Sequence, residues 1–212
     1  VAVIFQLQSL MQFGGASATH IDWTMVPYVR KSFRKHYVDG LKYCEENFPF
    51  DPDKYLENIP EDVSIEDDEY KLRPKAYKYA MDMTTKETHQ AVEGMYHNLN
   101  TLQSRSGNQL PFTSINYGTC TLPEGRMVIK ALLEVSIEGL GKLHRTSIFP
   151  CGIFQVGEGI NKHPGDPNYD MYRLALTSTA KRLYPNYANI DWSVNKGYDK
   201  NDPCTYMGTM GK

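Results

Sequence analysis

A short stretch at residues 97–121 (HNLNTLQSRSGNQLPFTSINYGTCT) constrains the fold most, because it passes from a helix through a turn into a strand. Its helical part continues an apolar stripe with spacings of four, four and three: Ala91, Met95, Leu99 and Leu102. Residues 103–109 are polar and contain a glycine, which predicts a turn. Residues 110–117 are rich in aromatic and β-branched side chains, which predicts a strand. A polar turn before a buried strand is a common location for a binding site.

The predicted strand places two polar side chains on one face. Side chains alternate along a strand, so Ser114 and Asn116 share a face with Phe112. Polar side chains that face an enclosed interior need hydrogen-bond partners, and a ligand rich in hydroxyl and phosphate groups would supply them. Neighbouring backbone or water would satisfy the same side chains, so the strand alone leaves both interpretations open.

The order of the predicted elements indicates an α/β fold with parallel strands. Helices that begin at Pro123 and Met171 separate three predicted strands, at residues 110–117, 147–156 and 186–192. Crossovers of this length join parallel strands, and ligands gather at the carboxyl ends of such strands. We therefore expect a helical N-terminal portion and then a sheet, with one rim formed by residues 116–120, residues 155–161 and the residues after Trp192.

Helices are also expected before the sheet. Residues 1–12 predict an apolar, buried helix, and residues 24–47 predict a longer helix with Asp22 as its N-cap. The longer helix carries a basic face that is either solvated or able to bind phosphates: Arg30, Lys31, Arg34, Lys35 and His36. A third helix is expected to begin at a capping box formed by Thr84 and Glu87.

Two loops carry residue types that can bind metals. Residues 48–72 are acidic and proline-rich, and we expect a surface loop or insertion whose carboxylates are solvated. The second loop contains His163, Asp166 and Asp170, but its DP and PG dipeptides favour turns over a metal site. The chain as a whole, residues 1–212, is expected to form a single domain with this acidic insertion.

Composition argues against several functional classes. A net charge of −2 gives no basic footprint for nucleic acid, and no apolar run reaches the roughly 18 residues that span a membrane. Four cysteines are widely scattered and do not make a disulfide scaffold, which favours a reducing, cytoplasmic setting: Cys44, Cys120, Cys151 and Cys204. They also lack metal-ligand spacing, which predicts no metal site. Because the first residue is Val1 and not Met, we expect the chain to start inside a longer protein.

Seven strings, taken together and in this order, resemble the anaerobic (class III) ribonucleotide reductases, which are glycyl-radical enzymes. They are FGGASATHID at 13–22, RKHY at 34–37, NTLQSRSGNQLPFTSINYGT at 100–119, EGRMVIKALL at 124–133, IFPCGIFQ at 148–155, PGDPNYD at 164–170 and AKRLYPNYANIDW at 180–192. The resemblance covers nearly all of the chain except the acidic segment.

The resemblance implies a ten-stranded α/β barrel, of which this chain would be a partial catalytic-barrel domain. In the family, a finger loop enters the barrel with the radical cysteine in a Met-Gly-Cys-Arg motif. This sequence ends in Met210, Gly211 and Lys212, so Lys212 occupies the position expected for the cysteine. An ammonium group cannot replace the thiol, because only the S–H bond is weak enough to exchange a hydrogen atom with a carbon radical.

The family's cofactors are expected to lie outside this segment. In the family, an activase that uses S-adenosylmethionine and an iron–sulfur cluster installs the glycyl radical, and four cysteines hold a structural zinc. This sequence has no match to the glycyl-radical loop or to the zinc module, so no cofactor is assigned to it. Cys120 is interpreted as an ordinary small residue, because the family motif reserves no cysteine there.

The resemblance also implies binding residues. Substrate contacts are expected from the helix end, the turn and the strand: Asn100, Ser104, Asn108, Gln109, Ser114 and Asn116. Lys35 and His36 match a Lys-His pair near the family's effector site at the dimer interface. A lysine there would contact the phosphates of ATP or of a deoxynucleoside triphosphate.

We therefore expect a fragment of an anaerobic ribonucleoside-triphosphate reductase that is inactive by itself. Its expected partners are a ribonucleoside triphosphate substrate, nucleotide effectors, a second copy of the chain and the radical activase. The alternative is a non-catalytic nucleotide-binding or assembly module derived from that family. A relative of the formate lyases is disfavoured by the strings at 164–170 and 180–192.

Overall fold

A four-stranded parallel sheet forms the centre of the computed structural model, which describes residues 1–11, 14–45, 48–49, 51–102, 110–192, 197–199 and 201–209. The strands lie in chain order: β1 (Ala16–Ala18), β2 (Thr113–Tyr117), β3 (Cys151–Val156) and β4 (Asn186–Asn189). All three neighbouring pairs are parallel, so the α/β prediction is confirmed. The ten-stranded barrel stays a prediction.

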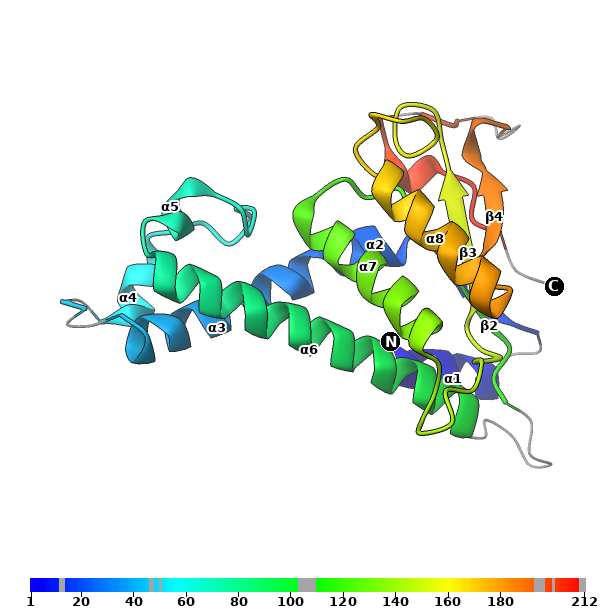
Figure 1. Ribbon diagram of the computed structural model, residues 1–212, viewed down its shortest axis with the longest axis horizontal. Coiled ribbons are helices and arrows are strands. Elements are labelled where there is room, and N and C mark those ends of the chain that lie inside the picture. Colours follow the sequence, from blue (N-terminus) through cyan, green and yellow to red (C-terminus); the bar gives the residue numbers. More distant parts are fainter. Residues whose placement is uncertain are drawn as a thin grey trace.

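Two groups of helices surround the sheet (Figure 1). The helices that follow β2 and β3 cover one of its faces: α7 (Pro123–Glu138) and α8 (Tyr169–Arg182). The others precede β2: α1 (Ala2–Met11), α2 (Ile21–Thr24), α3 (Val26–Tyr43), α4 (Pro52–Glu57), α5 (Asp68–Lys71) and α6 (Pro74–Thr101). Helices α3 and α6 run side by side as an arm that projects from the sheet, with α4 and α5 at its far end (Figure 1). No helix within the described residues is long and apolar enough to span a membrane.

The main core lies between the sheet and α7. Strand residues Ile115 and Phe154 are fully buried there and belong to the same cluster as residues of α7. The apolar stripe predicted for this helix is confirmed by three buried residues: Val128, Leu132 and Val135. Pro123 occupies the first turn and Gly139 follows the last residue with a φ of 78°, so the predicted helix limits are also confirmed.

A second core holds the arm together. Phe33 and Tyr37 of α3 are fully buried against Tyr70, with ring centroids 4.9 Å and 5.0 Å from that ring. Helices α3 and α6 approach closely at Gly40, where a Cβ atom would lie 2.9 Å from the backbone of Ala76. Only glycine allows this separation, because any larger side chain would force the two helices apart.

The acidic segment 48–72 is more ordered than the predicted surface loop. It contains α4 and α5, and Ile59 and Ile65 are buried in the second core. The predicted exposure of the acidic side chains is correct, since most of them are exposed around this apolar centre. The sequence pattern was misread because short helices with few apolar residues have no clear periodicity.

The two helix caps predicted before β2 were wrong. Helix α6 begins at Pro74, and Thr84 lies buried in its interior, so Thr84 and Glu87 do not form a capping box. Met25 occupies the N-cap position of α3, and the side chain of Asp22 is bonded elsewhere. In both cases the residues of a helix-start motif are present by chance, and tertiary packing decides where the helix begins.

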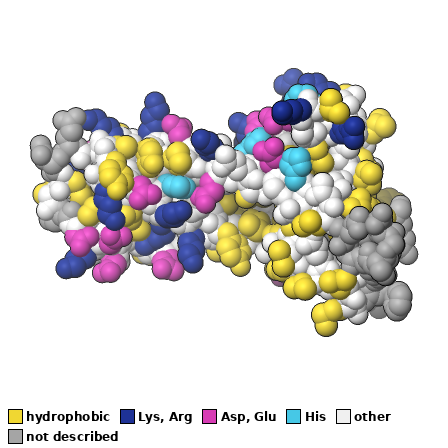
Figure 2. Space-filling view, turned by 90° about the horizontal axis from the view of Figure 1, so that it is seen from below, with side chains coloured by type: hydrophobic (Ala, Val, Ile, Leu, Met, Phe, Trp, Pro, Cys, Tyr) yellow, Lys and Arg dark blue, Asp and Glu magenta, His cyan; other side chains and the backbone are white. Residues whose placement is uncertain are grey.

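Helix α1 matches the prediction in its limits and contradicts it in its burial. Only Phe5 and Ser9 are buried, whereas the remaining apolar side chains are 55–87% exposed: Val3, Ile4, Leu7, Leu10 and Met11. Hydrophobic side chains gather in this region when the molecule is seen from below, while charged side chains of both signs cover the arm (Figure 2). An apolar groove of about 500 Å³ runs between α1, the start of α3 and the middle of α6.

The predicted strands are present but shorter. Strand β2 starts at Thr113, and β3 starts at Cys151, directly after the proline that the sequence placed inside the strand. The third predicted strand divides into β4 and a 3-10 turn (Ile190–Trp192). Strand β1 was not predicted, because three small residues carry no readable alternation.

The close contact of α3 with α6 predicts opposite effects for two glycine substitutions. Gly40→Ala should lower the free energy of unfolding by about 1–3 kcal/mol, because the new methyl group overlaps the backbone of Ala76. Gly94→Ala is the control, since a Cβ there meets no atom within 4 Å and alanine favours the helix by about 1 kcal/mol. Urea unfolding of both variants measures the difference, and equal effects would contradict the close approach.

Candidate functional site

The face of the sheet that points away from α7 carries polar side chains. We call Ser17, Ser114, Asn116 and Gln155 the polar sheet face. Ser114 is 1% exposed, Asn116 and Gln155 are 0% exposed, and Ser17 is half-buried, so most of the face is enclosed. The predicted pairing of Ser114 with Asn116 on one face is confirmed, since both side chains bond Ser17.

Hydrogen bonds within the chain use much of this polar capacity. The Ser114 hydroxyl donates to the hydroxyl of Ser17 over 2.9 Å. The Asn116 amide nitrogen donates to the carbonyl oxygens of Ala18 (3.2 Å) and Thr209 (3.0 Å). Its oxygen accepts from the backbone N–H of Thr209 at 3.1 Å. Asn116 therefore ties β2 to β1 and to a segment 93 residues later.

Gln155 keeps one polar atom unused. Its amide nitrogen donates to the carbonyl oxygen of Met207 over 2.9 Å. Its Oε1 atom is buried and has no hydrogen-bond partner among the described residues. A buried acceptor without a donor is unfavourable by about 1–3 kcal/mol. This atom is therefore a place where a donor from a ligand would be favourable.

The buried carboxylate of Asp22 holds the turn in which β2 ends. Its Oδ2 atom accepts from the backbone N–H groups of Gly118 (2.9 Å), Thr119 (3.1 Å) and Cys120 (3.0 Å). Its Oδ1 atom accepts from the N–H of Trp23. Complete burial raises the pKa of the Asp22 carboxyl, and the bonds from Cys120 and Gly118 oppose that rise. One side chain from before α3 thus places the carboxyl end of β2.

Two asparagines bind the carbonyl groups of the same turn. Asn161 donates to the carbonyl oxygens of Gly118 and Gln155, each over 2.9 Å. Asn168 donates to Gly118 (3.2 Å) and Cys120 (2.8 Å). Both asparagines are fully buried in the loop between β3 and α8. The ends of β2 and β3 are therefore joined at one rim, as the parallel topology predicted.

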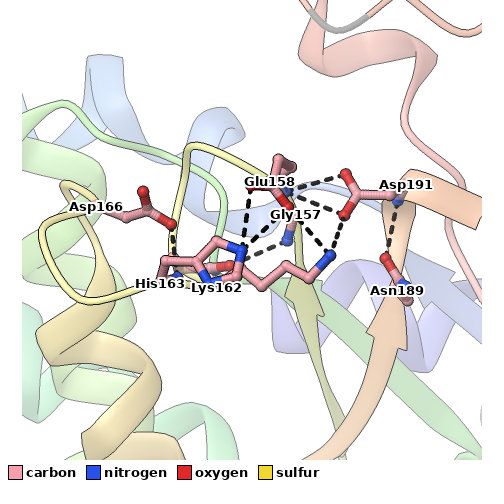
Figure 3. A network of polar contacts seen from close by, with 8 residues as sticks. Gly157, Glu158, Lys162, His163, Asp166, Asn189 and Asp191 are labelled. Carbon is pink, nitrogen blue, oxygen red and sulfur yellow. Dashed lines mark hydrogen bonds and ion pairs between the residues drawn. The ribbon is translucent and has the colours of Figure 1, made fainter.

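An exposed ionic network closes the outside of this rim (Figure 3). Lys162 lies 3.1 Å from a carboxylate oxygen of Glu158 and 3.4 Å from one of Asp191. The backbone N–H of Glu158 also donates to both carboxylate oxygens of Asp191. Hydrogen bonds from Lys162 and His163 lower the pKa of the Glu158 carboxyl. The network connects the β3–α8 loop to the turn after β4.

The histidine and aspartates of this loop do not converge on a metal position. The backbone N–H of His163 donates to Asp166 over 2.8 Å, which is a turn contact, and Asp170 pairs with Arg126 at 2.7 Å. Across the described parts of the chain, no group of three or more His, Cys, Asp or Glu residues could hold a metal ion.

Asn100 lies at the end of α6, beside the segment that enters β3. Its oxygen accepts from the backbone N–H groups of Ile148 (2.8 Å) and Phe149 (3.1 Å), and its nitrogen donates to the carbonyls of Tyr96 and Phe149. These bonds fix the end of α6 to the segment that enters β3. Among the described residues, Asn100 shares no hydrogen bond with Ser114 or Asn116. Ser104, Asn108, Gln109 and Lys212 lie outside the described residues.

Lys35 and His36 point to different environments on α3. His36 is 7% exposed and its Nε2 atom lies 2.8 Å from Glu87 of α6, to which Ser32 also donates. Bonds from Ser32 and His36 lower the pKa of the Glu87 carboxyl. Lys35 is exposed. Of the predicted effector pair, His36 therefore joins α3 to α6 within the arm, and Lys35 is the residue accessible to a phosphate.

Three residues that organise the rim were not identified from the sequence as such: Asp22, Asn161 and Asn168. Asp22 stood out only as a possible helix cap, although its position between Ile21 and Trp23 signals a carboxylate flanked by apolar residues. The asparagines lie in a loop whose turn dipeptides explained their presence locally. Their partners in the turn after β2 are 43–50 residues away along the chain, and no local pattern reports such pairings.

The comparisons with known proteins agree on one family. The family described as "Anaerobic ribonucleoside-triphosphate reductase" matches residues 1–210. Proteins of that name from Haemophilus influenzae and Escherichia coli are each 34% identical over 182 residues, which is 86% of this chain and 22% of theirs. The protein from Enterobacteria phage T4 is 34% identical over 82% of this chain and 24% of its own. The chain thus spans about a fifth to a quarter of the length of these relatives.

The packing of Cys120 predicts an unreactive thiol. The residue is 0% exposed against Gly125, and burial together with the charge of Asp22 raises the thiol pKa to about 12. At about pH 8 iodoacetamide should modify the exposed Cys204 faster than Cys120 by roughly a hundredfold or more, because the thiolate is the nucleophile. Mass spectrometry of timed samples measures both rates. Equal rates without denaturant would contradict the closed packing around the rim.

Proposed function

Because this chain belongs to the anaerobic ribonucleoside-triphosphate reductase family, we propose that the polar sheet face forms part of the wall that holds a ribonucleoside triphosphate for reduction. The observation that supports this is the unused Oε1 atom of Gln155 on an enclosed face of hydroxyl and amide groups. In a ribonucleotide the 2′ and 3′ hydroxyls of the ribose are the neutral donors that suit such a face.

The chemistry of the face favours the sugar over the triphosphate. Hydroxyl and amide groups are uncharged, and none of Ser17, Ser114, Asn116 and Gln155 supplies the positive charge that phosphate oxygens prefer. We therefore assign the ribose to this face and leave the phosphates to cations or backbone N–H groups elsewhere. Enclosure of the face also keeps bulk water from the sugar, which strengthens each hydrogen bond formed there.

We propose that the residues of the polar sheet face do not carry out the radical step. In the family the reaction replaces the ribose 2′-hydroxyl by hydrogen, and the sulfur radical starts it by removing the ribose 3′ hydrogen atom. We propose that the 212-residue chain binds nucleotide without turnover, because Lys212 stands at the position expected for the cysteine. Its own residues then hold and orient the sugar and exclude water.

An allosteric surface is the second candidate function. Lys35 is exposed on α3, and its charge is available to a nucleotide phosphate. We propose that a deoxynucleoside triphosphate or ATP effector binds beside Lys35, with homodimer formation over the same arm. A non-catalytic nucleotide-binding or assembly module would keep this surface and lose the reduction.

Calorimetric titration with ribonucleoside triphosphates tests the substrate proposal. We expect saturable binding that weakens about five- to tenfold in Gln155→Met, because the thioether cannot accept the ribose hydroxyl at full strength. Thr177→Ala, an exposed change on α8, is the control and should bind like the unchanged chain. Absence of saturable binding, or equal affinity in Gln155→Met, would contradict the assignment of the ribose to this face.

Titration with deoxynucleoside triphosphates tests the effector proposal separately. Lys35→Ala should weaken effector binding about tenfold, since a charge-assisted contact to phosphate is lost, and the loss should shrink at high salt. Lys142→Ala removes an equal charge from the loop after α7 and should have little effect. If both variants behave alike, Lys35 does not contact the effector.

A further inference from the structure

We propose that Asn116 and Gln155 are positioning residues that hold residues 207–209 over the polar sheet face. This inference rests on the proposed function, in which the polar sheet face holds the ribose. The two carboxamides come from neighbouring strands, β2 and β3, and both are 0% exposed. They contact the backbone of residues 207–209, so the contacts do not depend on which side chains this segment carries.

The side chain of Asn116 makes the same pair of hydrogen bonds to Thr209 that the backbone of a neighbouring strand would make. Its nitrogen donates to the Thr209 carbonyl at 3.0 Å while its oxygen accepts from the Thr209 N–H at 3.1 Å. A carboxamide has the same donor and acceptor groups as a peptide unit, so this pair reproduces the two bonds between paired strand residues. The same nitrogen reaches the Ala18 carbonyl at 3.2 Å, which anchors the amide to β1.

Gln155 supplies the second attachment two residues earlier. Its nitrogen donates to the Met207 carbonyl at 2.9 Å. Residues two apart in an extended chain face the same side, so Met207 and Thr209 can both present backbone groups to the sheet. The other polar atom of Gln155, Oε1, stays free for a ligand donor. One side chain therefore contacts the segment and, in the proposed function, the sugar.

Gly208 allows the segment to lie this close. A Cβ atom at this position would lie 2.4 Å from Cγ2 of Thr19, so a side chain would push the segment away from β1. On the other side, Tyr206 is 7% exposed and packs against Tyr198 with ring centroids 5.9 Å apart. The segment is thus fixed by an aromatic contact before it, a close approach within it and carboxamide bonds on both sides of Gly208.

Loss of the segment would leave buried polar groups unpaired. Asn116 would lose its hydrogen bonds to Thr209, and Gln155 would lose its side-chain bond to Met207, in a place that water enters poorly. This coupling makes the position of residues 207–209 depend on β2 and β3. Residues 207–209 are therefore placed relative to the same face that we assign to the ribose.

Amide hydrogen exchange of the 212-residue chain, measured by NMR, tests the inference without any nucleotide. In Asn116→Ala we expect exchange of the Thr209 N–H to accelerate about five- to tenfold, the effect of losing one or two ordinary hydrogen bonds. The N–H of Ile115 in β2 should stay protected, which separates local release from unfolding. Asn100→Ala is the matched control, since it removes a carboxamide whose four backbone contacts are to residues 96, 148 and 149, and Thr209 exchange should not change.

Gly208→Ala keeps the test decisive if Asn116→Ala unfolds. It leaves the sheet unchanged and should accelerate Thr209 exchange to a similar extent by displacing the segment from Thr19. Unchanged Thr209 exchange in Gly208→Ala, or in a folded Asn116→Ala, would overturn the inference. Failure of nucleotide binding with accelerated Thr209 exchange would reject the proposed function and leave the positioning role intact.

Discussion

The buried carboxylate of Asp22 is the contact on which the site depends. Strand β2 ends in a turn whose three successive N–H groups point inward, and Asp22 accepts a hydrogen bond from each of them. Without these bonds, three buried donors would be unpaired, at a cost of about 1–3 kcal/mol each. Asn161 and Asn168 bind the carbonyls of the same turn, so the rim is held from both sides. Strand β2 therefore enters and leaves the sheet at a fixed position, and so does the polar face that it carries.

The two faces of the sheet have different tasks. The face toward α7 is apolar and contributes most of the folding energy through burial, with Ile115 and Phe154 fully enclosed. The opposite face is enclosed as well, yet it carries hydroxyls and carboxamides, which stabilise a fold only when every polar atom is paired. A protein selected for stability alone would place apolar residues there. In the proposed function this polar face has a chemical reason, since a ribose presents hydroxyl groups to the surface that holds it.

Local patterns in the sequence predicted those helices and strands whose limits and faces are set by neighbouring residues. Helix α7 and strands β2 and β3 follow from periodicity and from Pro123 and Gly139, and the parallel order follows from the crossovers. The pairing of Ser114 with Asn116 on one face followed from strand alternation. Contacts between distant segments could not be predicted in this way. Asp22 looked like a helix cap, Thr84 looked like another, and the apolar residues of α1 looked buried, because caps and apolar stripes are local patterns whereas their partners are chosen by tertiary packing.

The free energy of unfolding of Asp22→Ala tests the central claim that this carboxylate fixes the rim of the site. Urea unfolding should show a loss of about 3–5 kcal/mol relative to the unchanged chain, since the turn keeps its buried donors and loses their acceptor. Asp53→Ala, which removes an exposed carboxylate from α4, is the reference and should change the free energy by less than about 1 kcal/mol. A loss in Asp22→Ala no greater than that of Asp53→Ala would contradict the account.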